Sequence, residues 1–193
     1  VDFVEEFILN LYSKEIFVFT PQGELKSLPK GATPLDFAFH IHTEVGMKTR
    51  GAKVNGKLVQ LNTVLHSGDQ VEIMTSESAK PNQNWLEYAT TGRARAKIKS
   101  SLRDEQKEVA DEGKEMLRRK LKSQKISLNE DVVNKMVNFF KLKTSLDLFF
   151  RVGNGAIDNQ RIKDFASSYN NAFLNFFKNK IRRTPTNEDL DKE

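Results

Sequence analysis

The chain has 193 residues, of which 30% are charged and 38% apolar, and this composition is ordinary for a soluble protein of one large or two small domains. The absence of cysteine excludes disulfides and thiolate metal sites, and no apolar run or N-terminal signal layout points to a membrane span or to export, so a cytoplasmic location is expected. The net charge of +5 is concentrated in residues 86–125, which hold 12 Lys or Arg against 7 Asp or Glu and therefore suit a polyanionic partner.

The first predicted element is a helix from Asp2 to Leu11, whose apolar residues recur near helical spacing. The chain begins with valine rather than methionine. We therefore expect residues 1–12 to be the end of a helix and linker that belong to a preceding domain.

Several strand signals follow within about sixty residues, a length at which a single small core is marginal but feasible. The signals are short runs of β-branched and aromatic residues bounded by turn residues. An Asn-Gly pair at positions 55 and 56 predicts a tight hairpin turn. The strands are expected at residues 16–20, at 25–28, on both sides of the turn within 53–59, and at 70–74.

One helix is predicted between the second and third strands, over residues 34–44. Thr33 can cap its start, Pro34 fits its first turn, and Asp36 stands where a carboxylate meets the free amides and the positive end of the helix dipole. The resulting order, β-β-α-β-β-β, is satisfied by a mixed sheet wrapped over one helix, the β-grasp or ubiquitin-like arrangement.

The sequence changes character after the last strand. Residues 77–84 are polar, contain a proline and predict a linker, and Trp85 opens a short apolar turn. Thr90 and Thr91 can cap a long helix from about 92 to 122. Because the apolar stripe of this helix is thin, most of its surface is expected to be exposed.

Three more helices are predicted in the rest of the chain. Ser127 and Glu130 form a capping-box pattern that opens the first of them. The second starts at Ser145 and ends at Gly153, where glycine permits a left-handed stop. The last opens at Asp158 and is rich in phenylalanine.

The β-grasp part resembles a TGS domain, a module named for threonyl-tRNA synthetases, certain GTPases and the RelA/SpoT stringent-response enzymes. The resemblance is carried by Val-Phe-Thr-Pro-Gln-Gly-Glu at 18–24, by the segment from Gly31 through Thr33-Pro34-Leu35-Asp36 to His40-Ile41-His42-Thr43, and by Ser-Gly-Asp-Gln-Val-Glu-Ile at 67–73.

The residues that follow are similar to the RelA/SpoT family in particular. The segment Asn84-Trp85-Leu86 is followed by Thr-Gly-Arg-Ala-Arg-Ala-Lys-Ile at 91–98, which resembles the Trp-Leu pair and Arg-Ala-Arg helix of that family. Residues 146–148 and 152–155 are similar to the end of its helical domain.

The resemblance implies an α+β protein, with a ubiquitin-like β-grasp (TGS) domain followed by an all-α helical domain. The expected divisions are the end of a preceding helix at 1–12, the TGS domain at 14–76, a linker at 77–84, the helical domain at 85–183 and a disordered tail at 184–193.

The function implied by the resemblance is regulatory. Such a segment would sense the uncharged 3′ end of tRNA on the ribosome and control the parent's catalytic domains in the stringent response. The segment itself would not be an enzyme, whereas its parent would be a GTP pyrophosphokinase, a guanosine-3′,5′-bis(diphosphate) 3′-diphosphatase, or both. Two alternatives stay open, a module that binds acyl carrier protein and an intramolecular autoinhibitory or dimerisation segment.

His42 is the first candidate contact for the tRNA end, with Thr43 beside it and His40 as the weaker alternative. From the residues alone, a half-buried histidine that caps the end of the helix is the favoured interpretation of His42. The resemblance favours the RNA contact, in which an imidazole stacks on a terminal base and hydrogen-bonds its phosphate or sugar.

Basic residues near the start of the long helix are candidates for RNA-backbone contacts, and a solvated helix face is the open alternative. Three of them follow one line at helical spacing and two stand beside it; they are Arg95, Lys99 and Arg103, with Arg93 and Lys97. The sequence contains no phosphate-cradling glycine loop and no metal-spaced His pair, so neither a catalytic residue, a metal nor a cofactor is expected.

Overall fold

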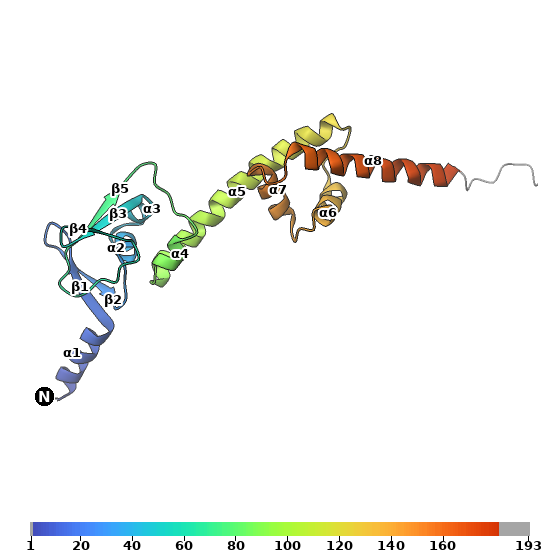
Figure 1. The fold of residues 1–193 in the computed structure, drawn as a ribbon. Coiled ribbons are helices and arrows are strands. Elements are labelled where there is room, and N and C mark those ends of the chain that lie inside the picture. The colour runs from blue at the N-terminus through green and yellow to red at the C-terminus, as the bar shows by residue number, and fades with distance from the viewer. Residues whose placement is uncertain (1, 182–193) are drawn as a thin grey trace, which may run out of the picture. The chain divides into compact units, whose positions relative to one another are not determined.

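The computed structural model describes residues 2–181, and the tail predicted at 184–193 lies outside them (Figure 1). Contacts divide the chain into two compact units, the first ending at Asp104 and the second beginning at Glu105. The elements are α1 (Asp2–Lys14), β1 (Glu15–Phe19), β2 (Leu25–Pro29), α2 (Pro34–Ile41), α3 (Thr43–Met47), β3 (Thr49–Val54), β4 (Lys57–Val59), β5 (Val71–Thr75), α4 (Trp85–Tyr88), α5 (Gly92–Ser123), α6 (Glu130–Phe139), α7 (Ser145–Gly153) and α8 (Asn159–Ile181).

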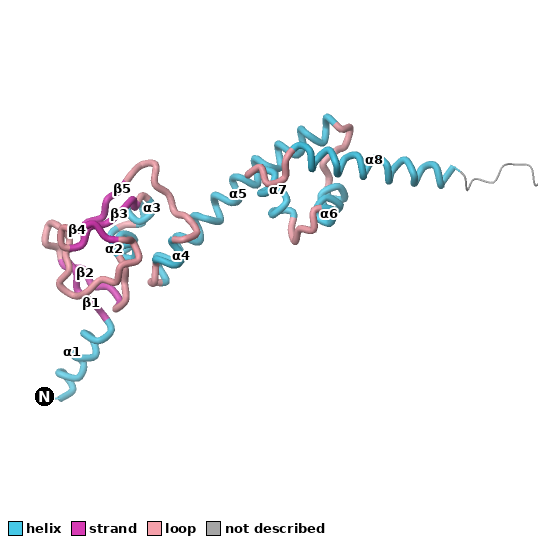
Figure 2. The backbone as a smooth tube through the Cα atoms, in the orientation of Figure 1, coloured by secondary structure: helices cyan, strands magenta, loops and turns pink. Residues whose placement is uncertain are grey.

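The first unit contains the predicted β-grasp domain, and the five predicted strands are confirmed (Figure 2). β1 pairs with β2, and β3 lies between β4 and β5, all antiparallel. A parallel bridge between Phe19 and Gln70 joins the two small sheets, so the arrangement is mixed as expected. The strands cover one side of α2, where Phe37 and the strand residues Val18 and Leu28 belong to one buried cluster.

The predicted Asn-Gly turn is confirmed between β3 and β4. Asn55 and Gly56 have φ angles of 51° and 78°, as a two-residue hairpin of type I′ requires. The amide of Asn55 also donates from Nδ2 to Oδ1 of Asp69 at 3.0 Å.

The start of α2 is as predicted, but its end is not. The Thr33 side chain accepts from the Asp36 N–H, and the Asp36 carboxylate accepts from the Thr33 N–H at 2.9 Å, which completes a capping box with Pro34 in the first turn. The helix predicted through residue 44 stops at Ile41, because His42 is extended (φ −163°, ψ 146°) and a separate short helix, α3, begins after it.

The segment that begins at Trp85 packs on α2, within the first unit. Trp85 is only 4% exposed and meets the ring of Phe39 edge to face, with 6.5 Å between ring centroids. Ala94 and Ile98 of α5 lie in the same buried cluster. The contacts therefore place residues 85–104 with the strands, although the helical domain was predicted to begin at residue 85.

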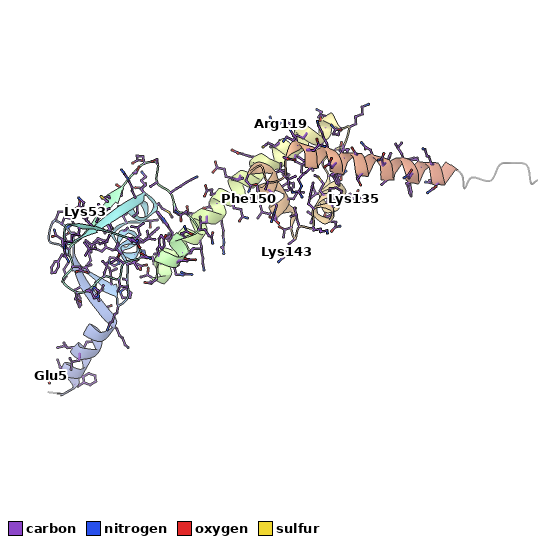
Figure 3. The ribbon with its side chains drawn as sticks, viewed as in Figure 1. Glu5, Lys53, Arg119, Lys135, Lys143 and Phe150 are labelled. Atoms are coloured by element: carbon purple, nitrogen blue, oxygen red, sulfur yellow. The ribbon has the colours of Figure 1, made fainter. Side chains whose placement is uncertain are left out.

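The second unit packs the later part of α5 against α6, α7 and the first half of α8. Lys135 of α6, labelled in Figure 3, pairs with Asp131 and lies 5.3 Å from the centroid of the Tyr169 ring. Its described residues share a buried cluster, whose members are Leu117, Leu121, Ile126, Val132, Met136, Leu148, Val152, Ile157, Ile162, Phe165 and Ala166.

Two predicted helix ends in this unit are corrected. Asn129, not Ser127, caps α6, and its side chain accepts from the Val132 N–H at 2.9 Å. Gly153 is not a left-handed stop, because it lies inside α7 against the backbone of α5, and the positive φ of 81° belongs to Gly155.

The apolar stripe predicted along α8 is only partly buried. Ile162 and Phe165 lie in the core of the second unit, whereas Phe173, Phe176 and Phe177 are 46–63% exposed. The start of the helix is as predicted, since Oδ1 of Asp158 accepts from the Arg161 N–H at 2.9 Å.

Candidate nucleic-acid interface

His42 links the two helices α2 and α3 and holds its ring in solvent. Its N–H donates to the carbonyl of Ala38 at the end of α2, and its Nδ1 accepts from the N–H of Glu44 at 3.2 Å, which caps α3. A ring nitrogen that accepts carries no proton, so this bond assigns the proton of the neutral ring to Nε2. The exposed edge of His42 therefore presents an N–H donor and an open ring face.

Thr43 and Lys97 are brought together although 54 positions separate them. Both line a cavity of about 490 Å³ between α3, the loop at 76–81 and the first turns of α5. Ser100 and Ser101 line the same cavity. A candidate for the RNA end and a candidate for the RNA backbone thus share one cavity, lined by the residue that follows His42.

His40 and Arg93 are brought together in the same way. Both line a smaller cavity of about 180 Å³ between α2, β2 and the start of α5. Partial burial lowers the pKa of His40 below its ordinary value, and the positive charges of Arg93 and Lys26 lower it further. This second hollow therefore has a cationic rim.

Arg95 faces a different direction from the other basic candidates. One of its guanidinium nitrogens donates to the carbonyls of Leu86 and Ala89, at the end of α4. The side chain is half-buried. Its charge thus stabilises the C-terminal end of a short helix inside the first unit.

Substituting Arg95 by Gln separates this structural role from RNA binding. We expect Arg95→Gln to lower the free energy of unfolding by about 1–2 kcal/mol, because two carbonyls lose a charged donor. Lys99→Gln, one turn further along the same helix, should leave stability unchanged because Lys99 is exposed. Chemical denaturation of both variants checks this, and equal midpoints would contradict the assignment.

Lys99 and Arg103 are exposed, and among residues 2–181 neither makes an ion pair. The five basic candidates, all on α5, therefore have different surroundings. Arg93 and Lys97 border the two cavities beside α2 and α3, Arg95 is bound to α4, and Lys99 and Arg103 face solvent.

Asp36 ties the strand-bearing part of the first unit to α5, a role that was not predicted. Its carboxylate accepts from the N–H groups of Thr33, Thr90 and Thr91 at 2.9–3.0 Å and from the hydroxyls of Thr90 and Thr91 at 2.8 and 2.9 Å. The residue is 1% exposed. Burial raises its pKa, but the hydrogen bonds from these threonines outweigh burial and hold the pKa below its ordinary value.

Asp36, Thr90 and Thr91 were each predicted to act at a helix start, but the hydrogen bonds between them were not predicted. Asp36 was predicted to meet the free amides at the start of one helix, and Thr90 with Thr91 to cap another. In the structure, Thr91 caps α5 through the N–H of Ala94 at 3.3 Å while its own N–H binds Asp36. One carboxylate thus fixes the start of two helices, and it sets Arg93 beside His40.

Neither a candidate metal cluster nor a candidate membrane span occurs in the described part of the chain. This part contains no cluster of three or more His, Asp or Glu side chains suited to hold a metal ion. None of its helices has the length and apolar content that a bilayer crossing demands.

Comparisons with known proteins match both units. A model of the TGS domain matches residues 16–75, and a model of the RelA/SpoT AH domain matches residues 101–164. A guanosine-3′,5′-bis(diphosphate) 3′-pyrophosphohydrolase of Aquifex aeolicus is 43% identical over 154 residues, which are 79% of this chain and 22% of that protein.

Two further relatives give the same result. A GTP pyrophosphokinase of Myxococcus xanthus is 40% identical over 152 residues, covering 78% of this chain and 20% of the relative. A pyrophosphohydrolase of Spiroplasma citri, named like the Aquifex protein, is 40% identical over 163 residues, covering 84% and 21%. The chain spans about a fifth of the length of the curated relatives it matches.

Proposed function

We propose, from the premise that this chain belongs to the RelA/SpoT family, that it is the regulatory part of a (p)ppGpp synthetase or hydrolase. Its task would be to sense the uncharged 3′ end of a tRNA on the ribosome and to control the catalytic domains of the whole protein. The catalysis named in the relatives is proposed for that whole protein and not for this chain.

The observation that carries the proposal is the geometry of His42. Its ring is exposed at a helix junction, and the bond from Glu44 leaves Nε2–H and one ring face open. A terminal base can stack on that face while Nε2–H donates to a ribose or phosphate oxygen. The cavity lined by Thr43 and Lys97 lies directly next to it and offers hydroxyl and ammonium groups to the same RNA end.

Control of catalysis requires that tRNA bind one arrangement of the parent better than the other. A ligand with equal affinity for both arrangements shifts neither, and a change from 1:99 to 99:1 needs about 10⁴-fold preference. Contacts from His42 and Thr43 alone are too few for this, so the basic residues Arg93, Lys97, Lys99 and Arg103 are proposed to add contacts to the RNA backbone. Each neutralised phosphate adds to the salt dependence of binding.

His42→Ala should weaken binding to ribosomes that carry deacylated tRNA by about tenfold, since base stacking contributes about 1–3 kcal/mol. Ribosomes that carry aminoacylated tRNA should bind the wild type and the variant equally weakly. Co-sedimentation of the full chain with each ribosome complex measures these occupancies.

His42→Asn is the matched control for this experiment. Asparagine keeps an acceptor for the Glu44 N–H and therefore caps α3, but it removes the stacking ring. If His42→Asn fails like His42→Ala while its thermal stability stays near that of the wild type, the ring itself contacts RNA. Equal occupancy of both tRNA states by wild type and variants would rule out the role at the tRNA end.

A further inference from the structure

The small cavity lined by His40 and Arg93 plays no part in the RNA contact proposed at His42. Its walls are apolar and come from Leu28 and Pro29 on β2, Phe39 on α2 and Ala94 on α5. His40 and Arg93 stand at its rim, both exposed. Within residues 2–181, neither side chain makes a hydrogen bond or an ion pair, so their donors are available to a ligand.

We propose that His40 and Arg93 together bind one nucleotide phosphate, with the apolar part of the same nucleotide resting against the cavity walls. The phosphate can belong to RNA, in which case the inference rests on the proposed function, or to a free nucleotide, in which case it does not. An arginine guanidinium and an imidazole are the side chains suited to such a contact, because the guanidinium binds two phosphate oxygens at once and the imidazolium adds a charged donor.

The charges around the cavity favour an anion. Arg93 on α5 and Lys26 on β2 both act on His40 and lower its pKa, which places two positive charges close to the ring. Lys26 is paired with Glu24 at 3.1 Å. The ionised carboxylate of Asp36 also lines the cavity and opposes an anion there, although the threonine donors on both of its oxygens offset part of its negative charge.

Binding of an anion reverses the effect of these cations on His40. In the free protein, partial burial lowers the pKa of His40, and repulsion of the imidazolium by Arg93 and Lys26 lowers it further. A phosphate between His40 and Arg93 attracts the imidazolium, so the pKa of His40 must rise on binding. This rise is a direct signature of occupancy.

The site differs from the one at His42. His40 lies in the last turn of α2 and borders the start of α5, whereas His42 lies beyond the helix and caps α3. The two histidines therefore report on two separate contacts, and a single measurement that resolves both rings distinguishes them.

The first test is an NMR titration of the three histidine rings of the full chain with inorganic phosphate. We expect phosphate to raise the pKa of His40 while His66 does not move. Arg93→Gln should weaken phosphate binding about tenfold, as loss of a charged, two-pronged contact implies. Arg119→Gln, the same substitution on an exposed part of α5, is the matched control, and its His40 should titrate like that of the wild type. The inference is overturned if His40 does not respond, or if it responds equally in Arg93→Gln.

Two further NMR titrations identify the kind of molecule that carries the phosphate. A short RNA ending in CCA and free GMP are each titrated in place of phosphate. If the RNA moves His40, and Arg93→Gln reduces the salt slope of RNA binding by about 0.7, the phosphate is part of RNA. If GMP moves His40 and the RNA does not, the site takes a free nucleotide. If inorganic phosphate moves His40 but the RNA binds nowhere, the phosphate site is supported and the proposed function is not.

Discussion

Replacing Asp36 by asparagine should lower the free energy of unfolding of the first unit by about 3–5 kcal/mol, the range seen when one partner of a buried charged contact is removed. The native carboxylate accepts from six donors, the N–H and hydroxyl groups of Thr33, Thr90 and Thr91. An asparagine oxygen accepts only some of these bonds, and its NH₂ group points donors at donors. Buried N–H groups would lose their acceptors without regaining water.

The loss of stability in Asp36→Asn should be confined to the first unit. Amide hydrogen exchange of the full chain resolves residues 16–102 from residues 105–165, and only the first set should lose protection in Asp36→Asn. Thr90→Val is the milder control, because it removes one hydroxyl donor and leaves the N–H bond; it should cost about 1 kcal/mol. An unchanged exchange pattern in Asp36→Asn would contradict the role given to this carboxylate.

The lowered pKa of Asp36 also predicts how the stability of the first unit depends on pH. Because its pKa is lower in the folded chain than in the unfolded chain, the unfolded state binds the proton more tightly. Its contribution is therefore complete above the ordinary carboxyl pKa and is lost as the pH falls through the lower, folded-state pKa. In Asp36→Asn, this part of the acid dependence should disappear.

The same substitution has a consequence for RNA binding. Thr90 and Thr91 lie three and two positions before Arg93, so the Asp36 contact places the start of α5 beside His40 and the cavity at Thr43. Loosening it should weaken RNA binding even though Asp36 touches no RNA in the proposed contact. Substituting Asp36 thus tests whether the position of α5, and not only its charge, matters.

Much of the first unit was predictable because its signals are local. The Asn55-Gly56 turn and the Thr33 cap depend on residues within four positions of each other, and these short-range preferences agree with the fold that forms. The break at His42 was missed for the same reason. Residues 34–44 carry a helical pattern, and the bond from Glu44 that starts α3 has no counterpart in that pattern.

Contacts between distant residues could not be predicted from one sequence. Asp36 and Thr91 are 55 positions apart, and nothing in either local pattern marks them as partners. The charges of Arg95 and Lys99 look alike in sequence, yet one binds α4 and the other faces solvent. The candidate site consequently depends on tertiary packing, which sorts equivalent charges into structural and exposed ones.

Gly113→Ala should lower the free energy of unfolding of the second unit by about 3 kcal/mol, although the same change inside a helix ordinarily adds about 1 kcal/mol of stability. A Cβ at Gly113 would lie 1.9 Å from the carbonyl oxygen of Phe149 and 2.6 Å from the nitrogen of Gly153. These are backbone atoms, so no side chain can rotate away and α5 must separate from α7. Gly92→Ala at the start of the same helix is the control, because its Cβ would meet nothing within 4 Å.

The reciprocal substitution sharpens this test. A Cβ at Gly153 would lie 2.1 Å from the carbonyl oxygen of Val109, so Gly153→Ala forces the same two helices apart. Once one alanine has separated the two helices, the second alanine causes little further separation. The double variant should therefore lose clearly less free energy of unfolding than the sum of the losses in the two single variants. Thermal unfolding of the four proteins measures this coupling. Additive losses would mean that the two glycines do not share one close helix crossing, and a stabilised Gly113→Ala would mean that the crossing is looser than the structure has it.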